Sequence, residues 1–210
     1  MALDGLTVAV PRGALLSDTL DLLDHLGVDT DEVRANARRL LFAEAGIVTM
    51  RPSDVPTYVE AGAADLGITG KDVLSEQSER AVYELADLGF GPCRMVFATV
   101  DGDDPAARAL RRLGVMRVAT KYPKVASRWF ERTGRQAEIV EVKGSVELAP
   151  LTGLVEGIVD LTATGSTLRE NGLVIRDEIF ASTARLIANP VAHKLKAPAI
   201  DALVERLRAP

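Results

Sequence analysis

The stretch Ile158-Val-Asp-Leu-Thr-Ala-Thr-Gly-Ser-Thr-Leu168 carries the clearest structural signal in this chain. Its first half is a short apolar run with the length of a buried strand, and its second half is a glycine-containing turn that opens a helix. Short runs rich in Val and Ile alternate with helical periodicities along most of the sequence. Repeated strand–helix alternation is typical of α/β proteins with parallel sheets. We therefore expect an α/β fold whose sheets are mostly parallel.

The same alternation predicts elements on both sides of this stretch. Apolar runs predict the strands, and apolar residues spaced three or four apart predict the helices. The expected strands lie at 6–10, 47–50, 65–69, 83–88, 94–100, 117–120, 138–142, 158–162 and within 173–188. The expected helices lie at 15–26, 54–61, 71–76, 105–113, 125–133, 146–155 and 198–208.

The turn Gly89-Phe-Gly-Pro92 is the expected crossing between two lobes. No linker-like composition marks the return, which we place near 177–182. Lobe I is then 1–89 plus 180–210, and lobe II is 90–179. A central cleft between two lobes is the usual place for a small-molecule site. The segment Gly62-Ala-Ala-Asp-Leu-Gly-Ile68 is similar to ligand-binding lobes of the periplasmic-binding-protein type, which supports this two-lobed architecture.

Composition excludes several classes of protein. The 210 residues include 25 Lys and Arg against 30 Asp and Glu, a net charge of -5, which argues against a nucleic-acid-binding surface. One cysteine and two histidines argue against an internal disulfide and against a His-rich metal site. No apolar run reaches the roughly 20 residues that cross a bilayer, and the N-terminus lacks the features of a signal peptide. We expect a cytoplasmic protein without resident metal.

Residues 160–167 have the chemistry of a phosphate-binding loop. Gly165 lets the backbone approach a ligand, and the hydroxyls of Thr164, Ser166 and Thr167 add donors beside the first free N–H groups of a helix. Asp160, just upstream, is suited to accept hydrogen bonds from ribose hydroxyls. Thr167 and Glu170 also fit the capping-box pattern. On these residues alone, an ordinary strand–turn–helix with a good cap remains the alternative.

Longer motifs point to one family. Gly144-Ser-Val-Glu-Leu-Ala-Pro150 precedes the loop, Arg51-Pro-Ser-Asp-Val-Pro-Thr-Tyr-Val59 and Gly70-Lys-Asp-Val73 lie in lobe I, and Ala119-Thr-Lys-Tyr122 lies in lobe II. Along the chain these motifs occur in the order typical of the ATP phosphoribosyltransferases, which open histidine biosynthesis, and the sequence resembles that family over nearly its whole length. The resemblance implies transfer of a phosphoribosyl group from phosphoribosyl pyrophosphate to N1 of the adenine of ATP, with release of pyrophosphate.

The resemblance also assigns roles in the loop. It implies that Asp160 holds the ribose of phosphoribosyl pyrophosphate and that Glu147 lines the same pocket. It also implies that the 5-phosphate is bound by Thr164, Gly165, Ser166 and Thr167.

The leaving pyrophosphate needs positive charge. The family usually has Lys-Gly-Arg after its first strand, where this chain has Arg12 followed by Gly13 and Ala14, so one expected cation is missing. Arg12 keeps a bidentate donor for phosphate. The resemblance places Arg38 near the pyrophosphate, and Arg39 is a candidate to supply the charge that Ala14 lacks. We expect Arg12 and Arg38 to be catalytic, although the run 34–39 is also compatible with a solvated face.

Four further residues are candidates for contacts with ATP or pyrophosphate. Arg51 ends a strand, where ligands collect in α/β folds. Gly70 and Lys71 form a second strand–glycine–helix junction that either binds an anion or only turns the chain. Tyr122 ends another strand and is a candidate contact for adenine.

No nucleophile–base pair is evident, which agrees with direct displacement of pyrophosphate. The resemblance implies Mg²⁺ bound with the substrate phosphates. The motifs end at Arg185-Leu-Ile187, and the remaining residues are too few for the C-terminal regulatory domain of the family's long form. We therefore expect the short form, a homodimer within a hetero-oligomer with a regulatory subunit similar to histidyl-tRNA synthetase.

Two alternatives stay open. A two-lobed binding or sensor protein could hold a nucleotide or phosphosugar without turning it over, and Ala14 favours this possibility. A different phosphoribosyltransferase would share the phosphate loop. It would not explain the stretches at 51–58 and 144–150.

Overall fold

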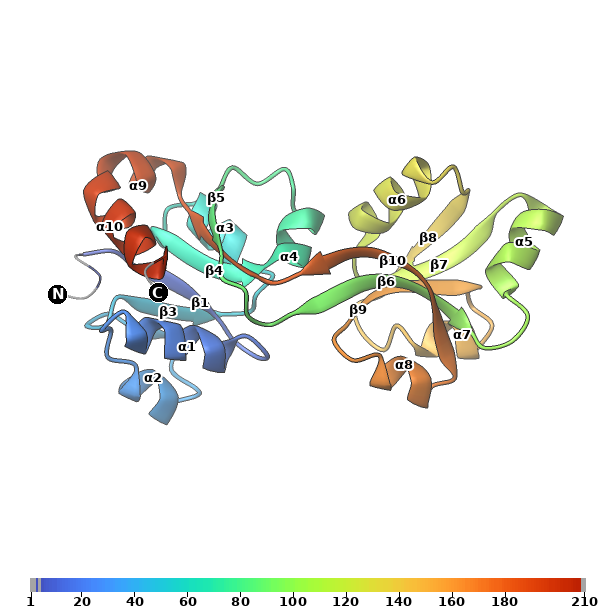
Figure 1. Cartoon of the computed structure of the whole chain (residues 1–210), viewed down its shortest axis with the longest axis horizontal. Helices are drawn as coiled ribbons and strands as arrows, with labels where there is room; N and C mark the ends of the chain where they lie inside the picture. Colours follow the sequence, from blue (N-terminus) through green and yellow to red (C-terminus); the bar gives the residue numbers. More distant parts are fainter. Residues whose placement is uncertain (1–2, 4, 209–210) are drawn as a thin grey trace. The chain divides into compact units, whose positions relative to one another are not determined.

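The structure is a computed structural model that describes residues 3 and 5–208 (Figure 1). The chain divides into two units: unit 1 runs to Gly91 and resumes at Thr183, and unit 2 is Pro92–Ser182. The first crossing lies within the expected turn Gly89–Pro92, two residues after the expected lobe boundary, and the return crossing lies three residues after its expected boundary. Residues 1, 2, 4, 209 and 210 of the expected lobe I lie outside the described part of the chain.

Unit 1 is built on a mixed sheet with the strand order β2-β3-β1-β4-β11-β5. The central strand β1 pairs in parallel with β3 and β4, and the other pairs are antiparallel. The strands are β1 (Val8–Pro11), β2 (Leu41–Phe42), β3 (Ile47–Met50), β4 (Leu66–Gly70), β5 (Tyr83–Asp87) and β11 (Ala184–Ala188). The helices are α1 (Leu16–His25), α2 (Asp31–Ala35), α3 (Val55–Glu60), α4 (Lys71–Glu76), α9 (Pro190–Leu195) and α10 (Ala197–Arg208).

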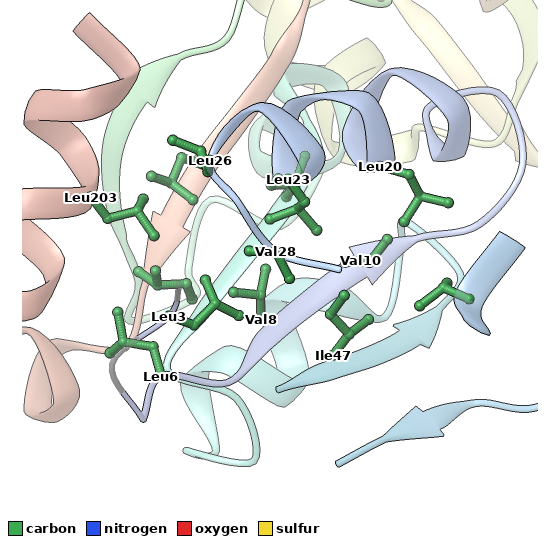
Figure 2. Close-up of a cluster of buried hydrophobic side chains, with 14 of the residues drawn as sticks. Leu3, Leu6, Val8, Val10, Leu20, Leu23, Leu26, Val28, Ile47 and Leu203 are labelled. Carbon is green, nitrogen blue, oxygen red and sulfur yellow. The ribbon is translucent and has the colours of Figure 1, made fainter. Parts of the chain in front are cut away.

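The main core of unit 1 lies where α1 and α10 cover the sheet (Figure 2). Val8 and Val10 point from β1 toward Leu20 and Leu23 of α1, and Leu203 of α10 packs against the same cluster. Each such side chain contributes about 1.5–3 kcal/mol by leaving water. Because β1 is buried on both faces, its position and that of the residues directly after it are fixed within unit 1.

Unit 2 has a second mixed sheet with the order β10-β6-β9-β7-β8. Strand β7 pairs in parallel with β8 and β9, whereas β6 pairs antiparallel with β9 and β10. The strands are β6 (Cys93–Val100), β7 (Met116–Thr120), β8 (Ala137–Glu141), β9 (Gly157–Thr162) and β10 (Leu173–Ser182). The helices are α5 (Pro105–Leu113), α6 (Pro123–Arg132), α7 (Leu148–Leu151) and α8 (Ser166–Glu170).

Helices cover both faces of the unit 2 sheet (Figure 1). On one face α5 and α6 pack around Phe97, Trp129 and Phe130. On the other face α7 and α8 pack around Ile158 and Leu168. In the described part of the chain, no helix is both long and apolar enough to span a membrane.

The expectation of mostly parallel sheets is wrong, because both sheets are mixed. The antiparallel pairs come mainly from the strands next to the crossings: β6 enters unit 2 and β10 returns from it, so they run in opposite directions. The same holds for β5 and β11 in unit 1. The parallel core of each sheet is three strands wide.

Several elements differ from the sequence-based expectation. The helix expected at 146–155 is only Leu148–Leu151. Pro150 lacks a backbone donor, and Gly153 turns the chain with a φ of 74° before β9 begins. The short elements α2, β2 and α9 were not expected, because two to six residues are too few for a periodic pattern.

Candidate functional site

The loop between β9 and α8 adopts a strand–turn–helix geometry with a left-handed glycine. Gly165 has a φ of 74° and directly precedes the helix. Its N–H donates to the buried Thr162 hydroxyl at 2.8 Å, which anchors the turn to the end of β9. A side chain at this position would be strained, and its Cβ would lie 3.0 Å from the Arg169 guanidinium. The sequence therefore needs glycine here for both conformation and space.

The polar groups of this loop are donors, and several are open. The Thr164 and Ser166 hydroxyls lie 3.0 Å apart and are exposed. Within the described residues, no acceptor is bonded to the backbone N–H groups of Thr167 and Leu168. The Arg169 guanidinium donates to the Thr164 carbonyl at 2.9 Å and so brings a positive charge to the loop. This set of donors suits an anion with several oxygens.

The capping-box prediction for Thr167 and Glu170 is wrong. The helix begins at Ser166, so Gly165 occupies the N-cap position and no side chain caps it. The Ser166 N–H instead donates to the Thr164 hydroxyl at 3.3 Å. The Thr167 hydroxyl, which the capping box would have used, makes no hydrogen bond with any residue that the structure describes.

Asp160 lies on β9 and is 7% exposed. One carboxylate oxygen accepts the Leu161 N–H at 2.9 Å, and the Lys121 ammonium lies 3.8 Å from the same oxygen. Lys121 follows β7, the parallel neighbour of β9, so both groups lie at the carboxyl ends of adjacent strands. The lysine therefore places a positive charge beside this largely buried carboxylate. Lys121 was expected only as a candidate to approach adenine, and Arg169 was not among the predicted site residues.

Glu147 and Tyr122 come from the same edge of the unit 2 sheet. The Tyr122 N–H donates to the Thr120 hydroxyl at the end of β7, and the ring packs partly against the α6 side of the core. The segment with Glu147 follows β8, after Val142 donates to the Thr120 carbonyl. Glu147 is half-buried and forms no ion pair with a described residue. Ser145, just before it, has a φ of 48°, a strained conformation for a residue with a side chain.

A second polar edge lies in unit 1, at the carboxyl ends of its parallel strands. Arg12 follows β1 and Arg51 follows β3, and the Arg12 N–H donates to the Met50 carbonyl at 2.7 Å. The Arg12 guanidinium also donates to the Ala37 carbonyl, which places the turn that carries Arg38 at this edge. The structure thus brings together three arginines that lie far apart in the sequence.

These arginines differ from their neighbours in what they contact. Arg38 and Arg51 are exposed and pair with no carboxylate within the described residues. Arg39 instead pairs with Glu32 and stacks on Phe42, 5.2 Å from the ring centroid. Its Nε also donates to the Leu41 carbonyl. Arg39 is therefore already engaged, and it is a poor replacement for the cation that the family usually has at position 14.

Arg34 is held inside unit 1 by carboxylates. Its guanidinium lies 2.7 Å from both Asp21 and Asp24. Hydrogen bonds from Thr30 and then Arg34 lower the pKa of Asp24 below its usual value. The three-arginine run at 34–39 therefore contains two arginines with structural contacts and one, Arg38, that is open.

Gly70 and Lys71 are more fully engaged than the sequence suggested. Gly70 belongs to the ladder between β4 and β11, and a Cβ there would collide with the buried Asp72 carboxylate. The Lys71 N–H donates to the Thr183 carbonyl at 3.0 Å, and its ammonium lies 2.6 Å from Glu84. An anion at this turn would have to compete with Glu84 for the ammonium.

The described residues contain no cluster of three His, Cys, Asp or Glu side chains arranged to hold a metal ion. The loop after β9 offers hydroxyls and N–H groups, which bind phosphate oxygens, rather than the carboxylate oxygens that hold a bare divalent cation. These residues fit a metal ion that is already coordinated by the phosphates of a substrate.

Comparison with known proteins agrees with these features. The model of the HisG family, described as ATP phosphoribosyltransferase, matches residues 51–209. An ATP phosphoribosyltransferase of Rubrobacter xylanophilus is 54% identical over 203 residues, covering 95% of this chain and 94% of the relative. One from Desulfitobacterium hafniense is 45% identical over 217 residues, covering 99% of this chain and 97% of the relative.

Solved structures give the same result. The ATP phosphoribosyl transferase (HisG:HisZ) complex from Thermotoga maritima contains a chain that superimposes with a TM-score of 0.80 at 36% identity, covering 97% of this chain and 96% of that one. The periplasmic aliphatic sulphonate binding protein of Escherichia coli, 12% identical over 96% of this chain and 70% of its own, has a TM-score of 0.59, which confirms the expected binding-protein-like fold. The chain belongs to the HisG family of ATP phosphoribosyltransferases.

Proposed function

We propose that this chain is the catalytic subunit of an ATP phosphoribosyltransferase of the short form. N1 of the adenine of ATP forms a bond to C1 of the ribosyl group while the bond from C1 to the pyrophosphate oxygen breaks. The electron pair of that bond leaves with pyrophosphate. The observation that carries the proposal is the loop after β9, with its left-handed glycine and open donors next to a buried aspartate, in a chain of this family.

The residues of unit 2 bind phosphoribosyl pyrophosphate. Asp160 accepts hydrogen bonds from the ribose hydroxyls, and the Lys121 ammonium lies 3.8 Å from its carboxylate. The oxygens of the 5-phosphate accept hydrogen bonds from the hydroxyls of Thr164, Ser166 and Thr167 and from the free N–H groups at the start of α8. Gly165 permits close approach of the backbone. Glu147, which has no ion-pair partner within the described chain, lines the same pocket.

The arginines of unit 1 neutralise the leaving pyrophosphate. Arg12 and Arg38 approach one another through the contact of the Arg12 guanidinium with the Ala37 carbonyl, and Arg51 follows the neighbouring strand. Both substrates are polyanions, so binding them together requires this positive charge. Catalysis then depends on positioning and on stabilising the charge that develops on the leaving group. Gly70, Lys71 and Tyr122 remain candidates for contacts with ATP.

Magnesium enters with the substrates in this proposal. Mg²⁺ keeps several waters and binds phosphate oxygens readily, so the ion would supply further neutralisation of the pyrophosphate. In this proposal the arginines of unit 1 bind the phosphate oxygens and not the ion itself. We also propose a cytoplasmic location for the enzyme, which agrees with relatives named ATP phosphoribosyltransferase.

The partner is a regulatory subunit similar to histidyl-tRNA synthetase, and the chain forms a homodimer within that hetero-oligomer. The support is the solved complex from Thermotoga maritima, whose name pairs HisG with HisZ, together with the similar length of the relatives.

Release of pyrophosphate from ATP plus phosphoribosyl pyrophosphate and Mg²⁺ tests the proposal. The chain is assayed alone and with its regulatory subunit, and we expect release that depends on both substrates. A chain that binds the substrates but releases no pyrophosphate under either condition would instead be the binding or sensor protein. That result would refute the enzymatic proposal.

A further inference from the structure

A pocket of about 510 Å³ lies at the edge of the unit 2 sheet opposite the phosphate loop. We call it the α5 pocket; its apolar wall includes Val100, Pro105, Ala109 and Val155, and its charged wall includes Arg108 and Arg112 of α5. Val155 lies just before β9, and the phosphate loop follows that strand. The six residues of β9 therefore separate the two sites by about 20 Å.

The α5 pocket carries uncompensated positive charge. Arg108 and Arg112 lie one helical turn apart on the same face of α5. Arg108 pairs with Asp103 at 3.1 Å, but both side chains are more than half exposed, so this contact is weak. No carboxylate within the described residues pairs with Arg112. Glu156, the acidic residue of the pocket, lies 2.6 Å from the Arg117 guanidinium and is already neutralised.

Large apolar side chains surround this charge. Leu113, which lines the pocket at the end of α5, is 74% exposed. Leu151 and Leu154, in the segment that forms the opposite wall, are about half exposed. Arginine beside exposed apolar side chains around a shallow pocket is the composition of an interface between proteins. The complementary surface is a carboxylate flanked by apolar side chains.

A second copy of this chain is a poor occupant. A two-fold contact centred on the pocket would bring the patch against itself. Arg108 and Arg112 of one copy would then face the same arginines of the other, and like charges held together cost free energy. The charge of the pocket therefore favours a different, acidic partner.

We propose that the α5 pocket docks the regulatory subunit, through an acidic side chain flanked by apolar residues that inserts between Arg108 and Arg112. This inference rests on the proposed function for the existence of that partner, but it assigns a surface distinct from the catalytic edge. Because the pocket lies at the far end of β9, docking leaves the phosphate loop open to substrate.

The test uses the full chain and the histidyl-tRNA-synthetase-like subunit of the source organism. Binding is measured by calorimetry for the unaltered chain, for Arg112→Glu and for Leu113→Asp. Arg111→Glu is the matched control, because Arg111 lies on the same helix and does not line the pocket. We expect Arg112→Glu and Leu113→Asp each to raise the Kd about 10-fold or more, and Arg111→Glu to change it by less than about 3-fold.

The remaining measurements separate the possible failures. Thermal unfolding of each variant and its pyrophosphate release without the partner should match the unaltered chain, because these residues are exposed and far from the loop. Equal affinity of all variants, or no complex with the unaltered chain, would overturn the docking proposal. A change in self-association of Arg112→Glu, measured by sedimentation, would instead assign the pocket to a second copy. If docking depends on Arg112 but the complex releases no pyrophosphate, the proposed function fails and the docking surface stands.

Discussion

The Lys121 ammonium lies 3.8 Å from the Asp160 carboxylate, across the carboxyl ends of two adjacent parallel strands. This distance is too long for a direct hydrogen bond, so the lysine acts through its charge. The aspartate side chain is 10% exposed and the lysine side chain 42% exposed. The pair therefore presents a carboxylate with a positive charge beside it at the rim of a polar loop, where the carboxylate can accept hydrogen bonds from a ligand.

Removal of loop side chains should weaken substrate binding without unfolding the protein. We expect Asp160→Ala and Thr167→Ala each to raise the Kd for phosphoribosyl pyrophosphate by about 10-fold or more, because each removes a hydrogen bond to a charged or polar ligand. Glu170→Ala on the same helix is the control and should leave the Kd unchanged. Calorimetric titration with circular dichroism checks both points, and unaltered affinity in both variants would refute the site.

Gly165→Ala should damage both stability and binding. A left-handed conformation costs a residue with a Cβ about 1–2 kcal/mol, and the new Cβ would also press on Arg169. Gly114→Ala is a matched control, since Gly114 has the same φ of 74° and nothing within 4 Å of its Cβ position. Chemical denaturation should show a loss in both variants. Only Gly165→Ala should weaken phosphoribosyl pyrophosphate binding, and an equal effect of both on binding would contradict the role of the loop.

Two neighbouring arginines should respond in opposite ways. Arg38→Ala should lower kcat/KM by about 10- to 100-fold, the effect of losing one charge-assisted hydrogen bond, and leave the thermal midpoint unchanged. Arg34→Ala should lower the midpoint, because Asp21 and Asp24 lose their common partner, and leave kcat/KM of the folded enzyme intact. Steady-state kinetics measures kcat/KM of the two variants, and thermal unfolding measures their midpoints. If Arg38→Ala lowered the midpoint but left kcat/KM unchanged, Arg38 would not be a catalytic residue.

The Glu156–Arg117 pair should make stability depend on pH. Burial raises the pKa of Glu156, but hydrogen bonds from the Arg117 side chain and backbone outweigh it, so the pKa lies below its ordinary value of 4.5. The pair therefore contributes stability above pH 4.5 that is lost as the pH falls through the folded-state pKa. Glu156→Gln should cost about 1–2 kcal/mol at pH 7, and the difference should vanish in acid. Denaturant titrations against pH measure it, with the exposed Glu131→Gln as a control that should show no such trend.

Local features of the fold were predictable. The β9–loop–α8 junction follows from an apolar run, a glycine and a helix start within eleven residues, and interactions this short in range are encoded in the order of the residues. The predicted capping residue, Thr167, lies two positions after the observed N-cap, Gly165. The Thr164 hydroxyl accepts a hydrogen bond from the Ser166 N–H. A side chain in the turn thus hydrogen-bonds a backbone N–H at the helix start, which is the kind of bond that the predicted capping box would have made.

It was harder to predict which side chains from distant segments meet at one edge of a sheet. The resemblance implied a shared role for Arg12 and Arg38, but only the structure shows how the arginines meet. The pairing of β1 with β3 brings Arg12 and Arg51 to one edge, and the Arg12 guanidinium contacts the turn that carries Arg38. The antiparallel strands around the two crossings were not expected, because their direction depends on how the chain leaves one unit and returns to it. The position of Lys121 beside Asp160 depends on the register between β7 and β9, which the order of the residues does not give.

From the order of its residues alone, this chain is identifiable as a member of its family, and its phosphate-binding loop can be located, because both depend on contiguous motifs whose chemistry is local. Which charged side chains are open and which are neutralised is a property of the folded chain. Arg34 and Arg38 lie four positions apart, yet one is held by two carboxylates and the other by none within the described residues. The α5 pocket likewise forms between segments about 50 residues apart. The physical reason is that a charge is neutralised by whichever groups the fold brings within a few ångströms, and those groups come from distant parts of the sequence.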